Sequence, residues 1–117
     1  MPAKKQGAVV VLCTCPTIEE AKALAHMLLE RQLIACANVV NSVQSIYQWK
    51  GSICDDSEVL MVMKSTEAQA DTVIETVASA HSYDVPEVLV LPVSAGYAPY
   101  LAWIGLSVSD GKRSPAS

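Results

Sequence analysis

The segment from His81 to Glu87 is the most informative stretch of this sequence, because it brings several titratable side chains together at a junction between two elements. It reads His-Ser-Tyr-Asp-Val-Pro-Glu, and it lies where a helical pattern ends and an apolar run, residues 88–91, begins. Proline pushes the residue before it toward extended backbone, so the segment should hold its side chains at fixed angles at one end of a strand. We therefore expect a functional site at this junction.

Two thiols, Cys13 and Cys15, lie two residues apart at the end of an apolar run near the N-terminus. Alternate residues of a strand share a face, so both thiols would point the same way, with about 6 to 7 Å of backbone rise between them. Two thiols with an imidazole suit Cu(I) or Zn(II). The alternative is that both cysteines are small core residues, because free cysteine is among the most buried residue types.

The other cysteines and the histidines have simpler interpretations. Cys36 lies in a predicted strand and Cys54 in a polar turn segment, and neither has ligand spacing, so we expect structural roles. His26 is expected on the solvated side of a helix. His81 has two open interpretations: a metal ligand, or a cap at a helix C-terminus, where the helix dipole favours the imidazolium.

A second candidate site is polar and centres on Lys64. This residue ends an apolar strand, so its ammonium group would be partly buried and would need a carboxylate partner. Tyr83, Asp84 and Glu87 can form a polar pocket with it, and we assign ligand binding to Lys64, Tyr83 and Glu87. A purely structural ion pair is the alternative, and Glu58 can join either arrangement.

Composition restricts the class of protein. The chain has 117 residues, 51% of them hydrophobic, which suits one domain with an aliphatic core. A formal charge of −4 and the lack of a basic stripe argue against nucleic acid as a partner. The apolar run at residues 8–13 is too short for a signal peptide or a membrane span. We expect a cytoplasmic protein with reduced thiols.

Hydrophobic patterns predict the elements that position these residues. Four strands are expected, at residues 8–13, 35–49, 59–63 and 88–91. Gly51 suits the turn after the second strand, because a tight hairpin needs left-handed backbone there. Capping-box spacing begins helices at Thr17 and Thr66, and Pro99 suits the first turn of a short last helix.

That order, βαββαβ plus a terminal helix, predicts an α+β fold: a ferredoxin-like split βαβ sandwich with two helices on one face of an antiparallel sheet. Several strands are apolar on both faces, so the uncovered face of a monomer would expose a large apolar patch. Packing against copies of itself in a closed cyclic oligomer would cover that patch. One domain is expected over residues 8–106, with flexible tails at 1–7 and 107–117.

Four aromatic side chains are candidates for a subunit interface: Tyr47, Trp49, Tyr100 and Trp103. Aromatic rings bury a large area at small entropic cost, which favours their use as interface anchors. A set that stacks on a metabolite bound between subunits is the alternative.

Several segments resemble one known family. They are residues 11–14 (VLCT), 33–38 (LIACAN), 45–51 (SIYQWKG), 57–61 (SEVLM), Lys64, 81–87 (HSYDVPE) and 100–104 (YLAWI). In this order, over roughly residues 8 to 106, the chain is similar to the CutA divalent-cation tolerance proteins. The resemblance implies a tight homotrimer, an architecture similar to the PII signalling proteins, and a link to copper and other divalent metals.

The resemblance also implies a metal site. In some members of the family a first-strand cysteine and two adjacent histidines at the end of the second helix are assigned as copper ligands. Cys13 and His81 match two of these places, and Ala80 occupies the third. A third ligand would therefore have to come from elsewhere.

Two functions from different classes remain open. One is a trimeric protein that binds copper or another divalent cation in metal tolerance and homeostasis. The other is a PII-like sensor or scaffold that binds a small anionic metabolite or a partner protein in clefts between subunits. An enzyme is not expected, because the sequence has no Gly-rich phosphate loop, no nucleophile with an evident base and no paired catalytic carboxylates.

Overall fold

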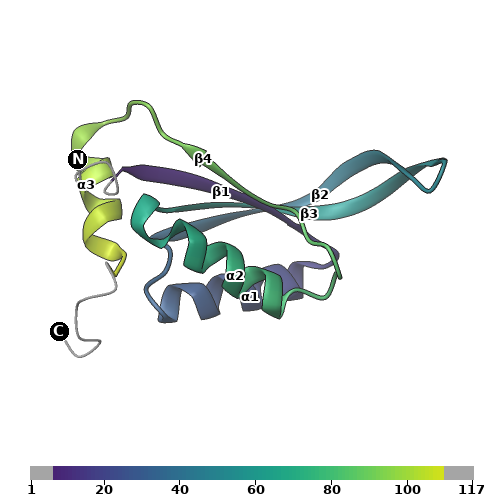
Figure 1. Ribbon diagram of the computed structural model, residues 1–117, viewed down its shortest axis with the longest axis horizontal. Helices are drawn as coiled ribbons and strands as arrows, with labels where there is room; N and C mark the ends of the chain where they lie inside the picture. Colours follow the sequence, from purple (N-terminus) through teal and green to yellow (C-terminus); the bar gives the residue numbers. More distant parts are fainter. Residues whose placement is uncertain (1–6, 110–117) are drawn as a thin grey trace.

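The structure is a computed structural model of the chain, and it describes residues 7–109. Its elements are β1 (Ala8–Cys15), α1 (Ile18–Glu30), β2 (Cys36–Trp49), β3 (Ser52–Thr66), the 3₁₀ turn η2 (Glu67–Gln69), α2 (Ala70–Ala80), β4 (Val88–Pro92) and α3 (Ala98–Ser107). In Figure 1, α1 and α2 lie together on one side of the sheet, and α3 lies at the end opposite the β2–β3 turn. The expected α+β, ferredoxin-like order is confirmed.

The sheet has four antiparallel strands in the order β2-β3-β1-β4. The central strand β1 therefore has a partner on each side: Cys13 lies opposite Met61 of β3 and opposite Val88 of β4. This register brings the start of β4, and with it the segment from His81 to Glu87, to the end of β1 that carries the thiols. The predicted junction site and the predicted thiol pair are thus at one end of one strand.

The hairpin of β2 and β3 is longer than the sequence predicted. Trp49 pairs with Ser52, so only Lys50 and Gly51 form the turn, and both have positive φ, 50° and 83°. This is the backbone of a two-residue hairpin turn whose twist matches that of the strands, and the expectation for Gly51 is confirmed. Because β3 starts at Ser52 and not near residue 59, Cys54 lies in a strand, and its expected turn position is wrong.

The two helix starts differ from each other. Thr17 caps α1 as predicted, since its Oγ1 accepts a hydrogen bond from the Glu20 N–H at 3.1 Å. Thr66 makes no cap bond; a 3₁₀ turn follows it, and α2 begins only at Ala70. The side chain of Gln69, which the capping box would have turned back toward Thr66, instead donates to the Ser109 carbonyl at 2.5 Å.

The core lies between the helices and one face of the sheet. It is made of the alternate residues of β1 and β3 that face the helices, together with the apolar stripes of α1 and α2: Val9, Val11, Cys13, Cys15, Val59, Met61, Met63, Ala21, Leu24, Leu28, Val73 and Val77. His26 is exposed on α1, as predicted. The polar Ser65 is tolerated in this layer because its hydroxyl donates to the Leu33 carbonyl at 2.6 Å.

The opposite face of the sheet and the far part of the hairpin are apolar and uncovered in the single chain. Leu89 and Leu91 of β4 are 54% and 44% exposed, and Trp49 and Ile53 beside the hairpin turn are 58% and 78% exposed. Figure 1 shows this hairpin extending well beyond the helices. Soluble monomers rarely carry so much contiguous apolar surface, so a covering partner is expected.

The domain reaches slightly farther than residue 106. Val108 is buried, and the Ser109 N–H donates to the Gln32 carbonyl at 2.8 Å, so residues 107–109 belong to the folded unit and not to a tail. The rest of the tails expected at 1–7 and 107–117 lies outside the described residues, apart from Gly7. Within residues 7–109, no helix combines the length and the hydropathy that a bilayer crossing requires.

Candidate metal centre

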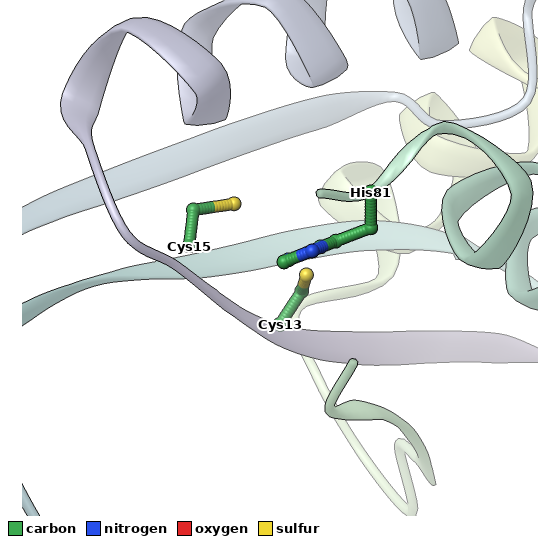
Figure 2. A group of neighbouring side chains, drawn as sticks. All are labelled: Cys13, Cys15 and His81. Carbon is green, nitrogen blue, oxygen red and sulfur yellow. The ribbon is translucent and has the colours of Figure 1, made fainter. Parts of the chain in front are cut away.

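Cys13, Cys15 and His81 come together at the end of β1. One ligand atom from each, the two thiol sulfurs and a ring nitrogen, lie within 4.8 Å of one another (Figure 2). Both cysteines are fully buried, and His81 is 8% exposed. The two residues that the sequence assigned to metal binding, Cys13 and His81, are therefore neighbours, and Cys15 stands where the missing third ligand is needed.

The backbone explains why the thiols meet the imidazole. Cys13 and Cys15 are alternate residues of β1, so both side chains face the helices. His81 is the C-cap residue of α2, with φ −75° and ψ 147°, and this extended backbone turns the chain away from the helix axis and back across the end of the strand. Its N–H still donates to the Val77 carbonyl at 2.9 Å, which fixes the turn.

Hydrogen bonds fix the orientation of the His81 ring. Nε2 lies 2.7 Å from the Thr14 carbonyl oxygen, which can only accept, so Nε2 carries a proton and donates. The Tyr83 N–H donates to Nδ1 at 3.0 Å. These partners assign a neutral imidazole protonated on Nε2. A metal ion would have to replace one of the two bonds.

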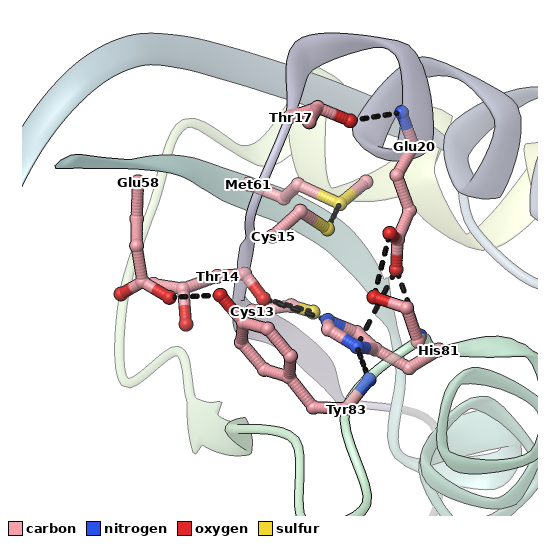
Figure 3. Close-up of polar contacts among 10 residues, drawn as sticks. Cys13, Thr14, Cys15, Thr17, Glu20, Glu58, Met61, His81 and Tyr83 are labelled. Carbon is pink, nitrogen blue, oxygen red and sulfur yellow. Dashed lines mark hydrogen bonds and ion pairs between the residues drawn. The ribbon is translucent and has the colours of Figure 1, made fainter. Parts of the chain in front are cut away.

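Glu20 ties this ring to α1. Its Oε2 lies 3.4 Å from His81 Nδ1, and its two carboxylate oxygens accept from the Ser82 N–H at 2.9 Å and the Ser82 hydroxyl at 2.8 Å (Figure 3). Burial works against the charge, but the two hydrogen bonds from Ser82 outweigh it, and the pKa of Glu20 lies below its usual range. The capping-box spacing that begins at Thr17 places the Glu20 carboxylate at the cap of α1, and that part of the expectation is wrong.

The environment acts differently on the two thiols: it opposes a free thiolate at Cys13, whereas the side-chain hydrogen bond with Cys13 lowers the pKa of Cys15. The pKa of Cys13 is raised above its ordinary value by its side-chain hydrogen bond with Cys15, by burial and by the negative charges of Glu87 and Glu20. An ion that binds here must therefore displace a proton from sulfur, which a soft, strongly thiophilic ion can do.

The spacing of the cluster fits a small ion after minor adjustment. Metal–sulfur bonds of about 2.3 Å and metal–nitrogen bonds of about 2.0 Å place three ligand atoms around an ion at about 4 Å from each other. The observed limit of 4.8 Å exceeds this by less than 1 Å.

The second predicted site is not assembled within one chain. The Tyr83 hydroxyl donates to Glu58 Oε2 at 2.7 Å, and burial, together with this bond, raises the pKa of Tyr83. The Lys64 ammonium donates to Asn38 Oδ1 on β2 and makes no ion pair with a carboxylate of residues 7–109. Glu58 and Lys64 are six residues apart on β3, about 20 Å at the rise of a strand. The expected pairing of Lys64 with Asp84 or Glu87 is therefore wrong for a single chain.

The remaining thiols lie elsewhere. Cys36 is half-buried on β2 with its sulfur 3.7 Å from the Tyr100 hydroxyl of α3, and Cys54 is half-buried near the hairpin turn. Sequence reasoning missed Met61, whose thioether lies 3.7 Å from Cys15 Sγ, and it missed the role of Glu20. Met61 could have been found from the alternation of β3, because it shares the core face with Val59 and Met63.

Together the fold and this cluster define a class: a ferredoxin-like α+β protein with a buried sulfur and imidazole donor set at one end of its central strand. Residues 9–107 match the family described as CutA1 divalent ion tolerance protein. The chain belongs to this family, as the resemblance implied.

Relatives support the assignment. Protein CutA homolog of Xenopus laevis is 45% identical over 92 residues, which cover 79% of this chain and 61% of that protein. Divalent-cation tolerance protein CutA of Pectobacterium atrosepticum is 42% identical over 101 residues, 86% of this chain and 92% of that protein. The chain thus spans less than two thirds of the Xenopus relative but most of the bacterial one. A relative from Arabidopsis thaliana is named as chloroplastic.

Solved structures agree with the fold. CutA1 from Oryza sativa superposes with a TM-score of 0.87 at 36% identity, over 92% of this chain and 98% of that one. The divalent cation tolerance protein from Thermus thermophilus gives a TM-score of 0.84 at 37% identity, over 87% and 99%.

Proposed function

We propose that this protein binds copper, or another divalent cation, at Cys13 and His81, and that it acts as a homotrimer in metal tolerance and homeostasis. The observation that carries the proposal is the convergence of two thiols and an imidazole within 4.8 Å at a buried strand end. Sulfur and imidazole donors suit copper and zinc, and the name of the Pectobacterium relative refers to divalent-cation tolerance. When bound, the ion would be held by a thiolate and a ring nitrogen.

The homotrimer is supported by the uncovered apolar surface. Exposed side chains of β4 and of the β2–β3 hairpin form an apolar area that water disfavours, and the edge strands β2 and β4 carry unpaired backbone groups. A closed cyclic assembly buries both features in every subunit and leaves no apolar edge open.

Isothermal calorimetry and competition with a chelator test the metal site. Wild type, Cys13→Ser and His81→Ala would each be titrated with Cu(I), Cu(II) and Zn(II), beside Cys36→Ser and His26→Ala as matched controls away from the cluster. We expect stoichiometric binding by wild type and by both controls, and a loss of about 100-fold or more in affinity for the two site variants. Equal affinities for all five proteins would contradict the proposal.

A structural role for His81 is the competing account of the same contacts. Pairing between β1 and β4 ends at Cys13, and His81 then satisfies the Thr14 carbonyl beyond it. If His81→Ala lowers the melting temperature but leaves metal affinity unchanged, the ring serves only the fold. The titration and a melting curve on the same samples separate the two roles.

One observation favours the second function, a PII-like sensor or scaffold. Lys64 is half-buried, and its hydrogen-bond partner among the described residues, Asn38, is neutral, so its charge is not balanced within one chain. An anionic metabolite, or a carboxylate of a neighbouring subunit, can supply the missing charge in a cleft between subunits that Lys64 of one chain shares with Tyr83 and Glu87 of another. A thermal-shift screen of nucleotides and organic acids on wild type and Lys64→Met tests this. Both proposals are for binding without catalysis.

A further inference from the structure

The cluster at the end of β1 contains a third sulfur atom. The Cys15 thiol donates to the thioether of Met61 at 3.7 Å (Figure 3). Met61 also lies directly opposite Cys13 in the β1–β3 register. Cys13, Cys15 and Met61 are all fully buried. Two neighbouring strands therefore bring three sulfur atoms to one place, and the turn after α2 adds an imidazole.

Met63 shows what ordinary core packing looks like on this strand. It is as fully buried as Met61, lies two residues farther along the same face of β3, and is opposite Val11. Core filling explains Met63 completely. It does not by itself require that the other buried methionine of β3 lie opposite one thiol and against a second.

The donor set is soft, and it lacks oxygen ligands. The nearest carboxylate to the ring is that of Glu20, and both of its oxygens already accept hydrogen bonds from Ser82. Hard divalent ions prefer carboxylate, carbonyl and water oxygens, and the full burial of the three sulfur residues keeps water away. Thiolate and thioether ligands together select Cu(I).

We propose that Cys15 and Met61 complete the site as soft sulfur ligands beside Cys13 and His81, and that the ion it takes is monovalent Cu(I). The inference rests on the proposed function, and it changes two points of it: the missing third ligand is supplied by β1 itself, and the preferred ion is the reduced form of copper. Ala80 occupies the place of a histidine ligand in some members of the family and cannot bind a metal. With Cys15 and Met61 as ligands, the site does not need a donor at that position.

Anaerobic competition with a chromogenic Cu(I) chelator tests the ligands one by one. Cys15→Ser should lower Cu(I) affinity about 100-fold, as expected for the loss of one thiolate ligand. Met61→Leu keeps the side-chain volume and should lower affinity about 10-fold, because a neutral thioether is a weaker donor. Met63→Leu and Cys36→Ser are the matched controls and should bind as wild type does. Circular dichroism confirms folding, and Cys15→Ala replaces Cys15→Ser if the serine variant does not fold.

X-ray absorption on the wild-type Cu(I) complex gives an independent readout that needs no variant. We expect a first shell dominated by sulfur, with more than one sulfur for each nitrogen. Wild type should also bind Cu(I) more tightly than Zn(II) in parallel competitions.

The outcomes distinguish this inference from the proposed function. If Cys15→Ser and Met61→Leu bind Cu(I) as tightly as wild type while Cys13→Ser and His81→Ala do not, the added ligands are refuted and the metal site stands. Tighter binding of Zn(II) than of Cu(I) overturns the choice of ion. If wild type binds none of the ions, both proposals fail.

Discussion

Glu20 offers the sharpest test of how the cluster is held in place, through the change Glu20→Gln. Its carboxylate accepts two hydrogen bonds from Ser82 and lies 3.4 Å from the His81 ring, so it ties the N-terminus of α1 to the segment after α2. Hydrogen bonds to a charged group contribute about 1.5 to 3 kcal/mol each, and glutamine keeps one neutral acceptor worth about 1 kcal/mol. Both bonds are exposed to water, so the low end of these values applies, and we expect the variant to lower the free energy of unfolding by about 2 kcal/mol at neutral pH.

The contribution of Glu20 to stability should depend on pH in a defined direction. The folded-state pKa of Glu20 lies below its ordinary value of 4.5, so its contribution is fully present above that value and is lost as the pH falls through the folded-state pKa. Denaturant unfolding of wild type and Glu20→Gln at pH 7 and near pH 3 should therefore show a difference that shrinks in acid. Protomer concentration must be equal in all samples, because an oligomer's stability depends on it.

Glu19→Gln is the matched control. Both glutamates lie in the first turn of α1, where the helix dipole favours negative charge, so both variants lose that contribution, about 0.3 to 1 kcal/mol. Glu19 is exposed and should lose nothing more. If the two variants are equally destabilised, or if the effect of Glu20→Gln is the same at both pH values, the bonds to Ser82 do not stabilise this junction.

Three further predictions concern the surface and the core. Leu89→Asp on the open face of the sheet should convert the proposed trimer to smaller species in native mass spectrometry, whereas Leu29→Asp on the helical face should not; intact trimers of the first variant would place the interface elsewhere. Ser65→Ala removes a buried hydroxyl that donates to a backbone carbonyl and should cost about 1 to 3 kcal/mol in denaturant unfolding, and a change below about 0.5 kcal/mol would show that the carbonyl finds another donor. The bond to Asp56 raises the pKa of Tyr47 to about 12, so an absorbance titration should show a tyrosine near 12 that moves back toward 10.0 in Asp56→Asn, and no shift would mean that the pair is not formed in solution.

Local patterns in the sequence were enough for the parts of the fold that depend on neighbouring residues. The helix start at Thr17 and the tight turn at Gly51 follow from hydrogen bonds and backbone geometry within a few residues. The same reasoning failed at Thr66, where the spacing was identical but Gln69 bonds to the Ser109 carbonyl instead. A side chain that can choose between a nearby and a distant partner cannot be assigned from spacing alone.

The candidate site also depends partly on local sequence patterns and partly on the tertiary structure. Periodicity placed Cys13 and Cys15 on one face of one strand, and the resemblance added His81, so the sequence provided the thiols and the imidazole. It also grouped Lys64 with Tyr83 and Glu87, and the strand register separates them: within one chain Tyr83 reaches Glu58, about 20 Å along β3 from Lys64. A cleft between subunits that reunites these residues stays a prediction.

By itself the sequence determined the order of the elements, the face of each strand and the family, because these depend on residue types at fixed short spacings. Only the tertiary structure decided that Met61 lies against Cys15, that Glu20 bonds to Ser82 and not to its own helix, and that both nitrogens of His81 already have partners. Those contacts join segments that are distant in the chain, and they depend on strand register and on the angle at which α2 ends. Hydrophobic patterns specify which residues are buried, but the packing of the whole domain determines which buried groups meet.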